Sequence, residues 1–368
     1  MIQLKDLCQK ASSNIAQKDL EGHEGQYPIY GASGLIGYVD FYKQENPYVA
    51  VVKDGAGIGR VMCLPEKSSV IGTMQYILPN EGVNVHYLAF AMEHMNLAKY
   101  FSGATIPHIY FKDYGKEKLL ERTEKEQKSI AEILSKMDSL ISLRKQQIVK
   151  LDELVKARFV EMFGDLAAPQ CEYPELKLVD ICADADDIKC GPFGTQLNKD
   201  EYKTKGVAVW EIPQINSGFS EMPTHFITEE KAVILNAYSI EPGDIAMSRK
   251  GNVGKCGLFP ENLKKGIIHS DVLRIRVDKR KVDSCFMMYQ LHFSEAVKRQ
   301  IEMVSSGAIM AGINVTKLKQ IKVRIPELEN QRMFAAFVER VDQQKQTIQQ
   351  SLEKLELLKK ALMQEYFG

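Results

Sequence analysis

The chain contains an internal repeat, and this repeat limits the folds open to it more than any other feature. With an offset of 204 residues, positions 102–164 align with 306–368 without a gap, and 17 of the 63 aligned positions are identical. The starts of the two copies also match, because residues 4–8 resemble residues 178–182 at an offset of 174. The second copy therefore has about 30 extra residues in its middle. A chain of 368 residues can form two domains, so we expect a duplicated unit whose middle sections have diverged.

The second part of each copy has the pattern of a long helix. Between Lys116 and Phe163 there is no Gly or Pro, and apolar residues recur in steps of three and four. Thr123 and Glu126 fit a capping box, and Gly164 and Gly368 stand where helices stop.

Each apolar stripe is narrow, so neither helix can be buried on all sides. We expect the two helices to pair as an antiparallel coiled coil with pseudo-two-fold symmetry; the alternative is that each packs only on its own module. At ~1.5 Å per residue, a helix of roughly 35 residues spans about 50 Å. The residues expected in the interface are Ile130, Met137, Ile148, Leu151, Val341, Leu352, Leu355 and Leu358.

The remaining sequence predicts two mixed modules of helices and strands. Residues 48–52, 74–78 and 272–277 have the alternation or β-branching of strands, whereas 87–100 and 284–303 have helical patterns. The expected fold is α+β, with two mixed α/β domains separated by two long helices. The expected segments are 1–120 (domain 1), 121–164 (helical spacer 1), 165–326 (domain 2) and 327–368 (helical spacer 2).

Composition excludes several classes of protein. No apolar run is long enough to cross a bilayer, and the first residues lack a signal-peptide pattern, so we expect a cytoplasmic protein without membrane contact. The seven cysteines are scattered without metal-ligand spacing, which predicts free thiols and no metal site. No Walker A sequence occurs, and the glycines at 55, 57 and 59 have the wrong spacing for a dinucleotide fingerprint.

In this order, and with the duplication, several strings resemble the specificity subunit of type I restriction–modification systems. The resemblance covers essentially the whole chain, although the first module lacks a counterpart of residues 191–197. The matching strings are residues 27–38, 191–197 and 241–245, together with Glu126-Gln127 and Asn330-Gln331 at the starts of the spacers.

The resemblance implies a scaffold for enzymes rather than an enzyme. Members of this family are expected to read a split, asymmetric double-stranded DNA target with two domains, as part of a defence against foreign DNA. The helical spacers set the gap and dock two methyltransferase subunits, and a restriction or motor subunit can join. No cofactor is expected on this chain, because the partner subunits would use S-adenosylmethionine, ATP and Mg²⁺. The alternatives are a coiled-coil protein-interaction scaffold without DNA binding, and an enzyme with an unrecognised site.

Net charge does not by itself favour DNA binding, because 48 basic residues balance 48 acidic ones. Residues 240–281, however, hold ten Lys and Arg against five Asp and Glu. Glycine turns let a backbone approach phosphate, and Arg, Lys and Asn reach base edges, so the candidates lie on such turns and on the segments after the Ser-Gly-Ala repeats at 102–104 and 306–308. The candidates are Lys53, Asp54, Arg60, Thr105, Tyr110 and Lys112 in the first module, and Arg249, Lys250, Asn252, Lys255, Asn314 and Thr316 in the second.

Overall fold

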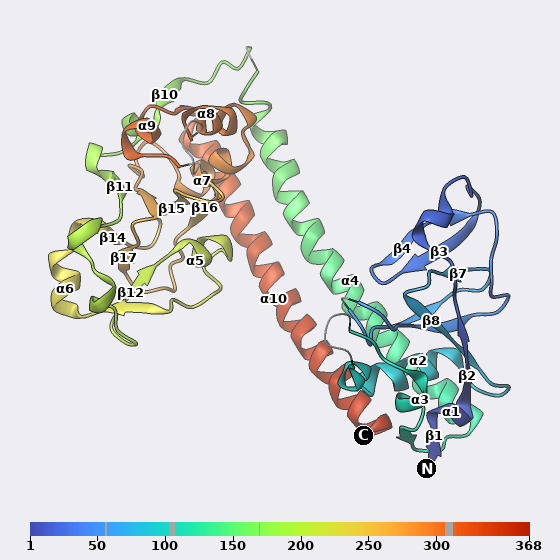
Figure 1. Cartoon of the computed structure of the whole chain (residues 1–368). Coiled ribbons are helices and arrows are strands. Elements are labelled where there is room, and N and C mark those ends of the chain that lie inside the picture. The colour runs from blue at the N-terminus through green and yellow to red at the C-terminus, as the bar shows by residue number, and fades with distance from the viewer. Residues whose placement is uncertain (56, 103–106, 169, 306–311) are drawn as a thin grey trace. The chain divides into compact units, whose positions relative to one another are not determined.

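A computed structural model describes residues 1–55, 57–102, 107–168, 170–305 and 312–368 (Figure 1). The chain divides into two compact units. Unit 1 consists of residues 1–148 and 347–368, and unit 2 of residues 149–346. Two long helices, α4 (Glu124–Phe163) and α10 (Leu328–Phe367), each contribute residues to both units. The predicted capping box is confirmed, because the Thr123 N–H donates to the Glu126 carboxylate at 2.8 Å and the Glu126 N–H donates to the Thr123 hydroxyl at 3.3 Å.

Unit 1 contains three small sheets. The main sheet has the order β2-β8-β5-β6 with antiparallel neighbours, the second has the order β4-β3-β7 with β3 parallel to β7, and β1 pairs with β9. The strands are β1 (Ile2–Gln3), β2 (Cys8–Ser12), β3 (Tyr27–Gly31), β4 (Gly34–Val39), β5 (Tyr48–Val52), β6 (Val61–Leu64), β7 (Ser69–Val70), β8 (Met74–Pro79) and β9 (Lys118–Leu119). The shorter helices are α1 (Leu4–Leu7), α2 (Val85–His94) and α3 (Phe111–Tyr114).

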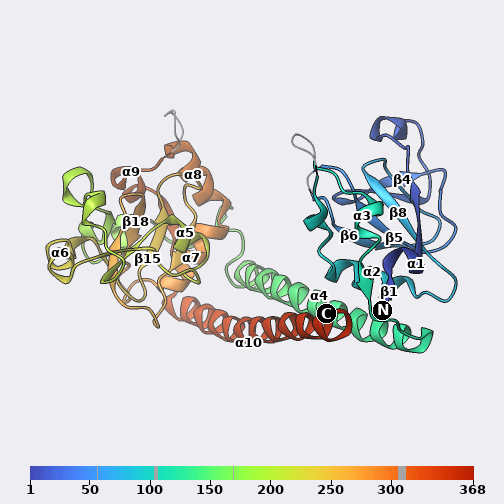
Figure 2. The same ribbon diagram turned by 60° about the horizontal axis from the view of Figure 1, so that its bottom comes forward.

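Strand β5, which the β-branched sequence at 48–52 predicts, is buried on both faces. Val49 and Val51 face a core cluster that includes residues of α2 and α4, while Tyr48, Ala50 and Val52 face a second cluster within the module. Helix α2 lies between this sheet and α4 (Figure 2). The sheet, α2 and α4 thus form successive layers of one core.

Unit 2 repeats this plan. Its sheets have the orders β11-β18-β15-β16, β13-β12-β17-β14 and β10-β19, and β12 is parallel to β17 as β3 is to β7. The strands are β10 (Glu175–Lys177), β11 (Ile188–Cys190), β12 (Val207–Trp210), β13 (His225–Ile227), β14 (Ser239–Ile240), β15 (Ile245–Ser248), β16 (Cys256–Leu258), β17 (Gly266–Ile268), β18 (Val272–Ile275) and β19 (Lys322–Arg324). The helices are α5 (Ile212–Asn216), α6 (Glu229–Ile234), α7 (Ser284–Phe293), α8 (Glu295–Ser305) and α9 (Val315–Lys319).

The duplication extends to single hydrogen bonds. Gln127, near the start of α4, accepts the N–H of Asn84 at 3.1 Å, and Gln331, near the start of α10, accepts the N–H of Asp283 at 2.9 Å. Asn84 and Asp283 cap the equivalent helices α2 and α7. Each identical glutamine therefore ties a long helix to the shorter helix of its module.

Within unit 1, the first part of α4 pairs antiparallel with the last part of α10. Lys145 lies 2.9 Å from Glu356, and Asp138 lies 2.8 Å from Lys359, so residue numbers fall along one helix as they rise along the other. Phe367, at the end of α10, belongs to the same core cluster as Ile130 near the start of α4. The antiparallel pairing expected from the sequence is confirmed.

Within unit 2, the last part of α4 pairs antiparallel with the first part of α10. Asp152 lies 2.6 Å from Lys345, and the Phe159 ring lies 5.4 Å from the Phe334 ring. Phe159 and Phe163 belong to the largest core cluster of this unit. The end of α4 thus completes the core of unit 2, while the end of α10 completes the core of unit 1.

One expected interface residue lies outside the helix pair. Ile130, Met137, Val341 and Leu352 are buried, and Ile148, Leu151 and Leu355 are partly buried, but Leu358 is 48% exposed. The neighbouring Lys359 makes the contacts that were expected of Leu358. Its ammonium lies 5.4 Å from the centre of the Phe90 ring and is paired with Glu93 and Asp138. A lysine can bury its stem along an apolar surface while its charge finds partners, which an apolar pattern does not show.

The helices predicted at 87–100 and 284–303 are confirmed, but each of them is interrupted once. Asn96 has a left-handed φ of 50° and separates α2 from a short 3₁₀ segment at Leu97–Tyr100. Ser294 adopts an extended conformation and separates α7 from α8. Asn tolerates left-handed backbone, and Ser offers alternative hydrogen bonds, so both interrupt a helix without disturbing its apolar pattern.

Candidate nucleic-acid interface

The predicted glycine turns follow equivalent strands, β5 in unit 1 and β15 in unit 2. Gly59 and Gly254 have φ values of 82° and 86°, in the left-handed region. A Cβ on Gly59 would lie 2.5 Å from the backbone nitrogen of Ala98, and one on Gly254 would lie 3.1 Å from the Ile301 side chain. Glycine is required at Gly59 because its turn packs directly on neighbouring backbone.

Each turn is joined to the segment that precedes α3 or α9. The N–H of Ile109 donates to the carbonyl of Lys53 at 3.0 Å, and the N–H of Ile313 donates to the carbonyl of Arg249 at 3.2 Å. Lys53 and Arg249 therefore occupy equivalent positions. The structure thus brings the two candidate segments of each module together, at positions 56 residues apart in unit 1 and 64 residues apart in unit 2.

In unit 1 this junction forms a polar pocket of about 240 Å³. Asp54 accepts from Lys53 at 2.6 Å and is bonded to Nδ1 of His108, which holds the imidazole in place. The Tyr110 ring lies 4.2 Å from the His108 ring, and Lys112 Nζ lies 5.1 Å from the Tyr110 ring centre. The pocket is lined by Lys10, Ser12, Lys53, Gln75, His108, Ile109, Tyr110, Phe111 and Lys112. Lys53 is paired with Asp54, while Lys10 and Lys112 add positive charge to this concave site, which suits a phosphate.

In unit 2 the equivalent arginine is used inside the protein. Arg249 donates from Nε to the Ile313 carbonyl at 3.2 Å and from Nη1 to the Ser270 carbonyl at 3.3 Å. Its guanidinium also lies 4.7 Å from the centre of the Phe193 ring. The geometry suits a residue that fixes its neighbours better than one that reaches out to phosphate.

The residue that follows Lys53 in unit 1 and the one that follows Arg249 in unit 2 carry opposite charges. Asp54 forms a β-bridge with His108, and Lys250 forms the corresponding bridge with Gly312. Lys250 is paired with Asp271 at 2.8 Å. The same backbone frame therefore presents different chemistry in each unit, as expected of domains that read different sequences.

The other candidates differ in how free their side chains are. Arg60 and Lys255 bond to the carbonyls of Ala32 (2.7 Å) and Asn216 (3.1 Å), whereas Asn252 and Thr316 are exposed. Thr105 and both Ser-Gly-Ala turns, apart from Ser102, lie outside the described residues.

The basic excess at 240–281 is partly structural. Arg274 is 4% exposed and donates to the Ser239 carbonyl at 2.7 Å. Arg276 donates to both oxygens of Asp244 at 2.7 Å, and Arg280 pairs with Asp278 at 2.8 Å. These three cations are engaged within the fold, so fewer basic side chains are free to contact DNA than the sequence indicates.

Asn314 has a structural role at its position. Its side chain accepts the N–H of Lys317 at 2.8 Å and caps α9. We expect Asn314→Ser to keep DNA binding near that of the wild type, because serine also caps helices, and Asn314→Ala to cost about 1 kcal/mol of stability. Thermal unfolding and a DNA titration of both variants check this. A loss of DNA affinity in Asn314→Ser at unchanged stability would instead show a base or phosphate contact.

Sequence reasoning missed both a lysine and a histidine of the unit 1 pocket. Lys10 reaches the pocket because β2 pairs with β8, a register that a single sequence does not show. His108 lies two residues before Tyr110, and its bond to Asp54, which the sequence does not show, identifies it as part of the site. In unit 2 Phe193 was part of a recognised motif but was not a candidate, and its contact with Arg249 singles it out.

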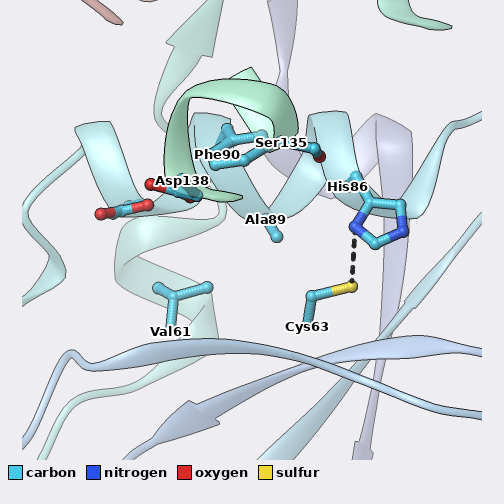
Figure 3. A pocket seen from close by; sticks show the side chains of 8 residues that line it. Val61, Cys63, His86, Ala89, Phe90, Ser135 and Asp138 are labelled. Atoms are coloured by element: carbon cyan, nitrogen blue, oxygen red, sulfur yellow. Dashed lines mark hydrogen bonds between the residues drawn. The ribbon is translucent and has the colours of Figure 1, made fainter. Parts of the chain in front are cut away.

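A second pocket of unit 1 places a thiol near an imidazole (Figure 3). Cys63 Sγ lies 3.5 Å from His86 Nδ1, a pair that spacing in the sequence could not reveal. Burial raises the pKa of the Cys63 thiol to about 11, so thiolate is scarce at neutral pH and the pair does not suit nucleophilic catalysis.

The described residues also offer little else for cofactor chemistry. The seven cysteines are free, as expected. In the described ranges no group of three or more His, Cys, Asp or Glu side chains could hold a metal ion. No helix of the described chain has the length and apolar content needed to cross a bilayer.

Comparison with known families identifies the class of protein that this duplicated fold represents. A family model described as the type I restriction modification DNA specificity domain matches residues 1–153 and 187–357, one match for each half of the chain. The chain belongs to this family. Its function is DNA target recognition in a type I restriction–modification system, which favours the DNA-binding interpretation over a scaffold without DNA.

Individual relatives agree over nearly the whole chain. Two proteins of Methanocaldococcus jannaschii are similar to this chain. The type I restriction enzyme MjaVIII specificity subunit is 23% identical over 98% of this chain and 89% of that protein. The putative type I restriction enzyme MjaX specificity subunit is 24% identical over 98% of this chain and 91% of that protein. The crystal structure of an S subunit from M. genitalium has the same fold, with a TM-score of 0.65 at 17% identity, covering 100% of this chain and 95% of that one. A chain from a structure that describes complex assembly of a type I restriction–modification system has a TM-score of 0.56 at 13% identity, and the match covers 99% of this chain and 96% of that one.

Proposed function

We propose that this chain reads a bipartite, asymmetric duplex target, one half-site per unit, and positions methyltransferase subunits on that DNA. The observation that carries the proposal is the turn after β5 and β15, where one backbone frame presents Asp54 in unit 1 and Lys250 in unit 2. Because the two modules differ at the same position, a single chain can read two unlike half-sites, which a symmetric homodimer cannot do. The long helices set the distance between the half-sites.

The chain's own part in this work is binding, without catalysis. The methyltransferase subunits would supply S-adenosylmethionine, and a restriction or motor subunit would use ATP and Mg²⁺. Membership of the family supports this division of labour. The complex would act in the cytoplasm, where the DNA is.

Exposed identities between the two long helices support two copies of one methyltransferase. Four positions on each helix, spaced by four, three and four residues, lie on one helical face, are exposed, and are identical in the two copies. Solvent alone does not require identical side chains, whereas docking of the same partner twice does. We call this set the repeated stripe: Lys150, Leu154, Ala157 and Glu161 in unit 2, and Lys354, Leu358, Ala361 and Glu365 in unit 1.

Co-expression with the methyltransferase of the same system tests the proposal. Methylation-sensitive sequencing of the host DNA should reveal one split motif that is methylated only when both chains are present. The methyltransferase expressed alone is the control. A stable complex with an active methyltransferase but no common motif would contradict the proposal and favour the protein-interaction scaffold.

A further inference from the structure

Each unit exposes one aromatic ring beside the basic residue that ends β5 or β15. Tyr110 is 47% exposed and lines the same pocket as Lys53 in unit 1. Phe193 is 48% exposed and lies against Arg249 in unit 2. Since Lys53 and Arg249 are equivalent, the two rings flank the same place in the repeated fold.

The rings come from different segments, so the duplication alone does not explain them. The counterpart of Tyr110 in unit 2 is Asn314, which caps α9. Strands β2 and β11 hold equivalent places in their sheets and end at Ser12 and Cys190. Phe193 lies three residues after the end of β11. Its counterpart in unit 1 is therefore Ile15, three residues after the end of β2, and Ile15 is only 8% exposed. The two units have diverged in sequence, and each carries an aromatic ring at this site on a different segment of its chain.

Both rings are held by contacts of their own. Tyr110 lies between His108, which Asp54 fixes, and the ammonium of Lys112. Phe193 lies against Arg249, which two backbone carbonyls fix. A side chain ordered before binding loses little conformational entropy when a ligand contacts it, which favours recognition.

The chemistry around the rings points to a nucleic acid base. Lys10, Lys53 and Lys112 line the pocket beside Tyr110, and since Lys53 is paired with Asp54, it is Lys10 and Lys112 that complement a polyanion there. An aromatic ring gains nothing from a phosphate, but in a groove of a duplex it packs against a base edge, and in particular against the methyl group of thymine.

We propose that Tyr110 and Phe193 each contact a base in one half-site of the target, and that Arg249 is a positioning residue that holds Phe193. This inference rests on the proposed function, because it assigns residues to the half-sites. Lys10 and Lys112 bind the adjoining phosphates in unit 1. Phe193 supplies the aromatic contact that unit 1 takes from Tyr110.

Binding of the assembled methyltransferase complex to its mapped target duplex tests the assignment of the rings. We expect Tyr110→Ala and Phe193→Ala each to weaken binding roughly 5- to 100-fold, the usual cost of losing the contacts to one base pair of a duplex site. Each variant should relax discrimination in one half-site only, and the two half-sites should differ. Tyr110→Phe and Phe193→Tyr, which keep the rings, should restore binding. Tyr38→Ala and Met222→Ala, exposed at 56% and 72%, are the controls and should bind like the wild type.

Salt dependence separates positioning by Arg249 from a direct phosphate contact. We expect Arg249→Ala to weaken binding as Phe193→Ala does, the double variant to lose no more than either single variant, and the slope of log affinity against log salt to stay unchanged. A phosphate contact would instead lower that slope by about 0.9. Such a change would overturn the role given to Arg249.

Three results would overturn the assignment of the rings. Binding by both alanine variants within two-fold of the wild type would refute it while leaving the proposed function intact. Equal loss at both half-sites with a lowered melting temperature would show a structural role. A wild-type complex with no specific target would refute the proposed function itself, and this inference with it.

Discussion

Replacing Phe159 with alanine is expected to destabilise unit 2 by about 3–5 kcal/mol, the usual cost of removing a fully packed aromatic side chain. Phe159 is 3% exposed, and its ring lies within 5.2–5.8 Å of the rings of Phe163, Phe286, Phe293 and Phe334. The effect should fall on the second module, although Phe159 lies in the helix that follows the first module in sequence.

Hydrogen exchange followed by mass spectrometry locates that effect. Protection should fall in β15, β18 and α7 of unit 2 and stay near the wild-type level in β5 and β8 of unit 1. Val160→Ala, at the next position and 52% exposed, is the matched control and should change little. Loss of protection mainly in unit 1 would show that the end of α4 belongs to the first module after all.

Replacing Leu358 with aspartate is expected to remove one of two bound methyltransferase subunits. Leu358 belongs to the repeated stripe, and its counterpart Leu154 is 46% exposed. A charge in the centre of an interface costs on the order of 2 kcal/mol or more, roughly a 30-fold loss at that site. Native mass spectrometry of the purified complex should show two methyltransferase subunits with the wild type, one with either single variant and none with the Leu154→Asp, Leu358→Asp double variant.

The adjacent Leu357 provides the control for this experiment. It is 69% exposed, but its counterpart in α4 is Glu153, so it is not part of the repeated stripe. Leu357→Asp should therefore keep both subunits, and all variants should melt near the wild-type temperature. Full occupancy in the double variant would rule out the repeated stripe as the docking surface.

The duplication and the long helices could be predicted from sequence because both depend on local and periodic information. Identical residues such as Gln127 and Gln331 mark equivalent positions without any knowledge of contacts. Steps of three and four define the helix face, which places most of the interface correctly. Lys359 could not be predicted, because its burial depends on Glu93 and Asp138, which reach it only in the folded chain.

The site was less predictable because its side chains are satisfied by distant backbone groups. Arg249 was a candidate for DNA contact as an arginine beside a glycine turn, yet it bonds to the carbonyl of Ile313, 64 residues away. Lys10 reaches the unit 1 pocket only through strand pairing. Sequence can show which residues carry charge, whereas the fold decides which charges remain free.

The exchange of helix ends between the units has a consequence for the order in which the chain can mature during synthesis. The core of unit 1 joins Leu4 and Tyr87 to Met363 and Phe367 of α10. At 5–20 residues per second, the roughly 200 residues between the ends of α4 and α10 take about 10–40 s to make. Until then the apolar side of α2 lacks part of its cover and stays open to chaperones and to other chains. Unit 2 can complete its core sooner after its strands are made, because Phe159 and Phe163 of α4 are synthesised before those strands. The module that leaves the ribosome first is thus the last to be completed, and defects in the end of α10 would mark unit 1 for degradation.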